Sequence, residues 1–115
     1  MKFYEKPSYL GCADAVADKS KLKQYKQQFK EMGFDDTVTW NLDVQIVKFI
    51  YPRLKRYYEL AFKQIDEPKL EADIKKILFA FKLYVEKDGM LNSSELKKFN
   101  NAKTLLNANF LKLWW

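Results

Sequence analysis

The chain has 115 residues and a formal net charge of +6 at pH 7. Hydrophobic residues make up 48% of the sequence while Gly and Pro number three each, so the composition excludes a disordered tail and favours a helical globular domain. The sequence contains no apolar run of about 18 residues, and its start lacks the apolar stretch of a secretory signal. We therefore expect one domain of the cytoplasm, with no membrane partner.

Residues 1–18 form the least regular part of the sequence, because Pro7 and Gly11 interrupt any helical period, and a poorly defined N-terminal segment is expected there. A single helical domain is predicted for residues 19–115. Its first helix starts at Lys19 and is predicted from apolar residues at spacings of three and four, namely Leu22, Tyr25, Phe29 and Met32. Gly33 is placed to end this helix as a C-terminal cap.

A second helix is predicted after a polar turn, with Thr39 or Asn41 as its N-terminal cap. Its apolar side is predicted to consist of Leu42, Ile46, Phe49, Ile50, Leu54, Tyr57 and Ala61. Pro52 lies within this helix and removes one of its backbone hydrogen bonds. Because Pro52 lies opposite the apolar side, we expect a kink there, with the proline toward solvent.

The third helix is predicted to begin at Pro68, which suits the first helical position, and to end at Gly89. Its apolar residues recur with a period of about 3.6 at Leu70, Ile74, Ile77, Leu78, Phe81 and Val85. Asn92 and Glu95 have the spacing of a capping box and open a fourth helix that runs toward Leu113. Because the connections are short, the predicted fold class is all-α, a compact bundle of about four helices.

Chemistry that depends on histidine or on paired cysteines is excluded. The sequence contains no His and a single Cys, Cys12, so it cannot form a Cys/His zinc site, a Ser-His-Asp triad, a Cys-His pair or an internal disulfide. It also lacks a glycine-rich phosphate-binding loop. We predict a non-enzymatic protein with no catalytic residue, cofactor or metal site.

The segment from Glu86 to Glu95 matches the later part of an EF-hand calcium loop, with Gly89 at the sixth position and Glu95 at the twelfth. Tyr84 then occupies the first ligand position, where it offers no acidic oxygen. A helix that ends at Gly89 and is followed by a capping box explains the same residues. We therefore predict a structural role for this segment.

Basic residues form two stripes at helical spacing. The first consists of Lys19, Lys23, Lys26 and Lys30, and the second includes Lys48, Lys55, Arg56 and Lys63. Such stripes suit an anionic partner, either a nucleic acid or an acidic protein, although a solvated helix face gives the same pattern. Only Arg53 and Arg56 among the basic residues are Arg, whereas bidentate recognition of phosphate and guanine favours Arg.

Aromatic residues exceed what one apolar stripe per helix requires. The extra ones are Tyr51, Tyr57, Tyr58, Phe79 and Tyr84. They indicate either a recognition surface or wide apolar faces in the core, and the sequence favours neither. We expect the terminal Leu113-Trp114-Trp115 to dock onto the bundle or onto a second subunit, because two Trp side chains are costly to leave in water.

The segment around the second helix carries a motif that resembles a family of small bacteriophage and prophage proteins. The motif has the form W-N-L-D…I-x-K-F-I-x-P-R-L-K and is matched by Trp40, Asn41, Leu42, Asp43, Ile46, Lys48, Phe49, Ile50, Pro52, Arg53, Leu54 and Lys55. The resemblance covers about residues 33–115, including Ile77, Leu78, Ala80, Phe81 and the L-W-W end. It implies a phage origin more than an activity, because these proteins mostly have no assigned function.

The motif has two interpretations. In the functional one, Pro52 bends the helix so that Arg53 and Arg56 turn toward Asp43 of a neighbour or toward a partner. The motif residues singled out for this interpretation are Trp40, Asn41, Asp43 and Pro52. In the structural one, the motif only specifies the kinked core helix.

We expect a phage-encoded accessory protein in the cytoplasm of the bacterial host, acting by binding a host or phage protein. An inhibitor of a host defence system, such as an anti-CRISPR, is one form of this role. The first alternative is a small basic nucleic-acid-binding module that uses the lysine stripes. The second is a structural or assembly protein of the phage, which we expect to form a homo-oligomer.

Overall fold

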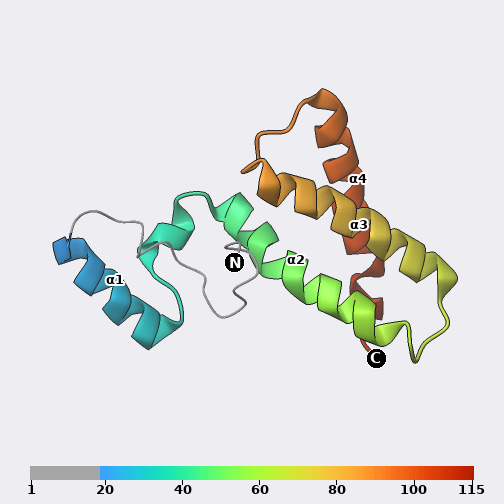
Figure 1. The fold of residues 1–115 in the computed structure, drawn as a ribbon, viewed down its shortest axis with the longest axis horizontal. Helices are drawn as coiled ribbons and strands as arrows, with labels where there is room; N and C mark the ends of the chain where they lie inside the picture. Colours follow the sequence, from blue (N-terminus) through green and yellow to red (C-terminus); the bar gives the residue numbers. More distant parts are fainter. Residues whose placement is uncertain (1–18) are drawn as a thin grey trace.

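A computed structural model of the chain describes residues 19–115, so the predicted N-terminal segment at residues 1–18 lies outside the described part. The described part contains four α-helices and no strand, which confirms the all-α prediction (Figure 1). The helices are α1 (Lys19–Met32), α2 (Leu42–Ala61), α3 (Pro68–Glu86) and α4 (Ser93–Asn109), with short 3₁₀ helices η3 (Asp36–Thr39) and η4 (Phe110–Lys112). None of these described helices has the length and apolar character that crossing a lipid bilayer requires.

The helix ends follow from local sequence as predicted. Gly89 has a φ of +80°, a region where an L side chain is strained, and its N–H donates to the carbonyl of Tyr84 at 2.9 Å to end α3. The Asn92 side chain accepts from the Glu95 N–H at 2.9 Å, and the Glu95 carboxylate accepts from the Asn92 N–H at 3.0 Å. The capping box at the start of α4 is therefore confirmed.

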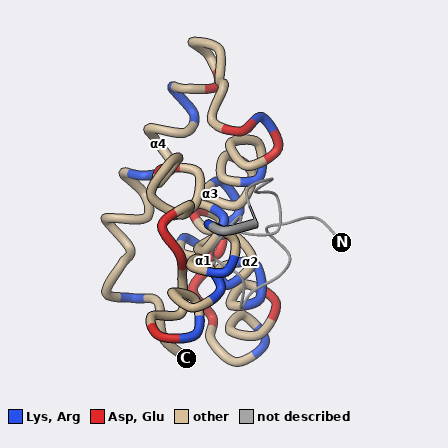
Figure 2. The backbone as a smooth tube through the Cα atoms, turned by 90° about the vertical axis from the view of Figure 1, so that its left-hand side faces the viewer, with Lys and Arg blue, Asp and Glu red and all other residues tan. Residues whose placement is uncertain are grey.

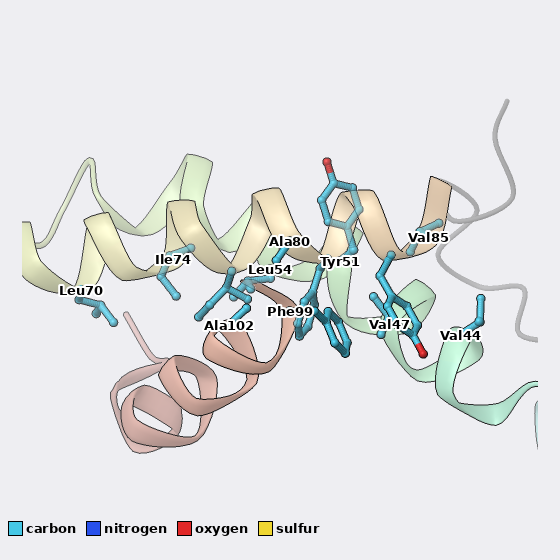
Figure 3. Packing of buried hydrophobic residues seen from close by; sticks show 13 residues of the cluster. Val44, Val47, Tyr51, Leu54, Leu70, Ile74, Ala80, Val85, Phe99 and Ala102 are labelled. Carbon is cyan, nitrogen blue, oxygen red and sulfur yellow. The ribbon is translucent and has the colours of Figure 1, made fainter. Parts of the chain in front are cut away.

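Three helices share the hydrophobic core. The helix α3 packs against α2 on one side and α4 on the other, and Figure 3 shows their buried side chains converging. Ile74 and Ile77 lie at the centre with no exposed surface. Around them are Val44, Val47, Tyr51, Leu54, Leu70, Ala80, Phe81, Tyr84, Val85, Phe99 and Ala102. Burial of an Ile side chain contributes about 1.5–3 kcal/mol, so α3 is the element on which the bundle depends.

The helix α1 lies beyond the N-terminal end of α2, apart from α3 and α4, and packs against η3 (Figure 1). Tyr25 is the one buried side chain between residues 21 and 32 of this helix, and its ring meets the Trp40 ring edge-on with centroids 6.3 Å apart. The Gln28 side-chain amide donates to Asp36 at 3.0 Å and accepts from the Asp36 N–H at 2.9 Å. Polar and aromatic contacts therefore connect α1 to η3 and Trp40. The described side chains of α1 do not belong to the core formed by α2, α3 and α4.

Two expectations for α2 have different outcomes. The helix continues through Pro52 without a break, and the proline is half-buried; a bend at this residue stays a prediction. Asn41 occupies the N-cap position, but its side chain makes no capping hydrogen bond. The helix start is instead held through Asp43, one residue inside the helix, whose carboxylate accepts a hydrogen bond from the hydroxyl of Tyr84.

Candidate functional site

An open groove lies between α2 and α4, where both helices rest on α3. It consists of two adjoining hollows of about 320 and 240 Å³ that share Ile50 and Leu106. The first hollow is lined by Asp43, Ile46, Val47, Ile50, Phe81, Tyr84, Phe99, Lys103 and Leu106. The second is lined by Phe49, Ile50, Arg53, Leu54, Tyr57, Leu106, Phe110 and Leu113. We refer to these two hollows together as the α2–α4 groove.

The walls of the α2–α4 groove expose large apolar side chains. Ile46 and Phe49 on α2 are 50% and 41% exposed, and Leu42 continues the same side of the helix at 50%. Phe110 faces them from the end of α4 and is 64% exposed. Contiguous exposed apolar surface on a soluble domain marks a binding site for another molecule, so this groove is the candidate site.

The rim of the groove is basic. The Arg53 guanidinium lies 3.8 Å from the centre of the Phe49 ring and donates to the Phe49 carbonyl at 2.9 Å. Lys103 lies on the opposite wall, with its ammonium 5.4 Å from the Phe99 ring centre. Asp43 is the one acidic residue among the described residues that line the groove. Arg53 and Lys103 are two positive charges against the single negative charge of Asp43, so the lining of the groove carries a small net positive charge.

The bond between Asp43 and Tyr84 fixes the first turn of α2 against the last turn of α3. The hydrogen bond from Tyr84 lowers the pKa of the Asp43 carboxyl below its ordinary value. Burial, together with the hydrogen bond and the negative charge of Asp43, raises the pKa of Tyr84 to about 12. The Tyr84 ring also stacks on Phe99 of α4 at a centroid distance of 4.2 Å. Tyr84 of α3 thus contacts both the motif carboxylate on α2 and Phe99 on α4, a contact that suits the structural interpretation of Asp43.

Motif residues line the α2–α4 groove, but the polar and charged ones do not form one cluster within the described residues. Trp40 is 62% exposed and lies beside Tyr25. Asp43 lies in the first turn of α2, whereas Arg53 lies near the middle of this helix. Ten residues of helix separate these two positions by about 15 Å. Arg56 does not turn toward Asp43, because its guanidinium pairs with Glu59 at 3.0 Å. That Arg53 and Arg56 turn toward Asp43 of a neighbour or toward a partner stays a prediction.

The two basic stripes stay apart. Lys23, Lys26 and Lys30 are exposed on α1, whereas the side chain of Lys19 lies outside the described ones. On α2, Lys55 is exposed and Lys48 is half-buried. Figure 2 shows Lys and Arg distributed over all four helices. Because α1 packs against η3 and not along α2, the structure does not merge the stripes into one surface.

The apolar side predicted for α2 was wrong in part. Leu42, Ile46 and Phe49 were expected in the core, but Val44 and Val47 occupy that position and the three predicted residues are exposed. The helix carries two apolar sets at helical spacing, and sequence periodicity alone does not say which one faces α3. The second set, Leu42, Ile46 and Phe49, was the feature of the sequence that could have indicated a binding surface.

The C-terminal segment docks through its backbone and Leu113. The Tyr57 hydroxyl donates to the carbonyls of Lys112 and Trp114 at 3.3 and 3.4 Å, and Leu113 packs on the core. Trp114 and Trp115 remain 73% and 50% exposed. The expected docking onto the bundle is therefore confirmed for Leu113 but not for the two indole rings.

The described residues contain no group of three or more His, Cys, Asp or Glu side chains that could hold a metal ion. Glu95, the last residue of the EF-hand-like stretch, is engaged by Lys87 and the Asn92 N–H, and the hydrogen bond from Lys87 lowers the pKa of its carboxyl. No protein-family model, curated protein or solved structure matches this chain.

Proposed function

We propose that this chain is a non-enzymatic protein that acts by binding another protein in the α2–α4 groove. The observation that carries the proposal is the row of exposed apolar side chains, Leu42, Ile46, Phe49 and Phe110, along a groove with a basic rim. A row of this kind at spacings of three and four suits the apolar face of an amphipathic helix. Acidic residues beside that face would complement Arg53 and Lys103.

The motif that resembles phage proteins supplies one wall of this groove. Six of its residues line the two hollows, namely Asp43, Ile46, Phe49, Ile50, Arg53 and Leu54. This placement supports a phage-encoded accessory protein whose partner is a host or phage protein in the bacterial cytoplasm. Inhibition of a host defence system, in the manner of an anti-CRISPR, is the form of this role that we propose.

The test compares groove variants with a matched surface variant. A photo-crosslinking amino acid at Ile46 would identify the partner, and its affinity for Phe49→Asp and Phe110→Asp would then be measured by calorimetry. Hot-spot residues contribute about 2 kcal/mol or more, so we expect each variant to bind at least about 30-fold more weakly. Phe79→Asp is the control, because Phe79 is 63% exposed, like Phe110, but lies outside the groove.

Three outcomes would overturn this proposal. One is a partner that binds both groove variants as well as the original chain. Another is a crosslink from Ile46 only to a second copy, with light scattering showing a dimer that the groove variants lose; this outcome would support the structural or assembly role. The third is a groove whose only ligand is a nucleic acid, which would support the basic nucleic-acid-binding module.

A further inference from the structure

A second exposed surface lies on α3 and α4 and shares no lining residue with the α2–α4 groove. It surrounds an open hollow of about 480 Å³ lined by Lys75, Lys76, Phe79, Ala80, Lys98 and Asn101. We refer to these residues as the Phe79 surface. Sequence periodicity left Phe79 as a surplus aromatic residue, and neither basic stripe included these lysines.

Phe79 is an aromatic ring that the core does not use. It is 63% exposed, whereas Tyr51 and Tyr84, two other surplus aromatic residues, are buried. The Lys98 ammonium lies 5.9 Å from the centre of the Phe79 ring. Lys75, one turn earlier on α3, has its ammonium 6.0 Å from the Tyr58 ring. Aromatic rings and lysines therefore alternate across three helices, from Tyr58 on α2 to Lys98 on α4.

The lysines of the Phe79 surface make no close ion pair within the described part of the chain, although Lys98 acts at longer range on the Glu95 carboxylate. No carboxylate lines the hollow, and Lys75, Lys76 and Lys98 form no ion pair with any described side chain. By contrast, Lys82 and Lys87 on the same pair of helices pair with Glu86 and Glu95. Three lysines around an exposed ring, with no carboxylate in the lining of the hollow, thus distinguish this surface from an ordinary solvated helix face.

We propose that the Phe79 surface binds single-stranded nucleic acid. An unpaired base stacks on the Phe79 ring, while Lys75, Lys76 and Lys98 neutralise the neighbouring phosphates. A single strand is favoured over a duplex, because an open ring can only stack on an unpaired base. It is favoured over an acidic peptide, because a carboxylate chain gains from the lysines but leaves the ring unused. The basic residues of this surface are all Lys, and Lys lacks the bidentate fork with which Arg recognises a particular base. We therefore expect binding that tolerates different base sequences.

The first experiment tests stacking on Phe79. Anisotropy of a short fluorescein-labelled oligothymidylate at low salt would give the affinity of the full chain and of Phe79→Ala. Loss of one base–aromatic stack, about 1–3 kcal/mol, predicts an affinity about 5- to 160-fold lower. An abasic strand of the same length should bind the original chain more weakly than the oligothymidylate does, by a factor similar to that of Phe79→Ala. Phe110→Ala is the matched control and should bind the oligothymidylate unchanged, since Phe110 has the same exposure but lies in the groove.

The second experiment tests the lysines. Changing Lys75, Lys76 and Lys98 together to Gln should weaken binding and reduce the slope of log affinity against log salt by about 2, at about 0.7 for each single-strand phosphate contact. The control changes Lys23, Lys26 and Lys30 on α1 to Gln, which removes the same charge from an exposed stripe. That variant should keep the original slope. All these positions are exposed, and circular dichroism would verify that each variant is folded.

Four results would overturn the inference. These are no binding of the oligothymidylate at low salt, equal binding by Phe79→Ala, equal weakening by the α1 control, and a polyglutamate peptide that competes as well as the oligothymidylate. The last result would assign the surface to an acidic protein. None of them bears on the α2–α4 groove, because the Phe79→Asp and Phe110→Asp variants separate the two surfaces.

Discussion

The bundle of α2, α3 and α4 and the region of α1 with η3 are built from different kinds of contact. In the bundle, Ile74 and Ile77 have no exposed surface and three helices close around them. In the α1 region, Tyr25 is the one buried side chain between residues 21 and 32, and two side-chain hydrogen bonds connect Gln28 with Asp36. A helix of 14 residues is marginal without packing.

The difference teaches that the stability of this chain is not uniform. The bundle gains apolar burial from every turn of α3, whereas Tyr25 is the one fully buried side chain that α1 contributes between residues 21 and 32. Segments with few buried apolar contacts open locally at a lower free-energy cost than the core does. Both proposed binding surfaces lie on the bundle, so they should survive opening of α1.

The largest expected effect comes from deleting core volume at α3. Changing Ile77 to Ala should lower the free energy of unfolding by about 2–5 kcal/mol, because it removes a transfer contribution and leaves a cavity. Changing Leu22 to Ala, on half-buried surface of α1, should cost less than about 1 kcal/mol. Urea denaturation followed by circular dichroism measures both. Similar losses for the two variants would contradict the comparison.

A medium effect is expected at the Asp43–Tyr84 bond, where the bundle begins. Changing Tyr84 to Phe removes a hydrogen bond to a charged but largely exposed carboxylate, so we expect a loss of about 1 kcal/mol at neutral pH. The pKa of Tyr84 is raised to about 12 in the folded chain. Its contribution is therefore complete below the ordinary tyrosine pKa of 10.0 and is lost as the pH rises through about 12.

At acid pH, the contribution of Asp43 to stability depends on pH in the opposite direction. Because the folded pKa of Asp43 lies below its ordinary value of 3.8, the stabilisation from this carboxylate is present above that pH and is lost as the pH falls further. Unfolding titrations of the original chain and Tyr84→Phe should therefore converge at both extremes of pH. If the difference in the free energy of unfolding between the two chains stayed constant from acid to alkaline pH, the contribution of the bond would not depend on the ionisation of Asp43 or Tyr84.

Sequence reasoning predicted the elements of this fold because their signals are local. Pro68 at the start of α3, Gly89 at its end and the Asn92–Glu95 capping box each depend on residues within one or two helical turns. The core face of α3 was also predictable, since its apolar residues form one clear stripe. Local signals therefore place the helices, independently of how the helices pack.

The candidate sites depended on packing that no local pattern specifies. Ile46 and Phe49 were predicted as core because α2 has two apolar sets, and only the position of α3 decides between them. Phe79 and Lys98 are 19 residues apart in the sequence and meet only because α3 and α4 pack together. Separate helices can each be predicted, but a surface shared by two of them follows from their crossing.

The smallest expected effect lies at the joint between α1 and the rest of the described chain. Changing Trp40 to Ala removes its edge contact with Tyr25 and should cost about 0.5–1 kcal/mol, the contribution of an aromatic pair. We expect amide exchange to become faster in α1 and η3, while the amides of α3 around Ile77 keep their protection. Hydrogen–deuterium exchange resolved by segment measures this. Changing Trp114 to Ala is the control, because Trp114 is also an exposed indole but lies at the other end of the described residues, after η4. Equal acceleration in α1 and α3 would mean that the two regions unfold as one unit, and that α1 is as strongly coupled to the core as α4 is.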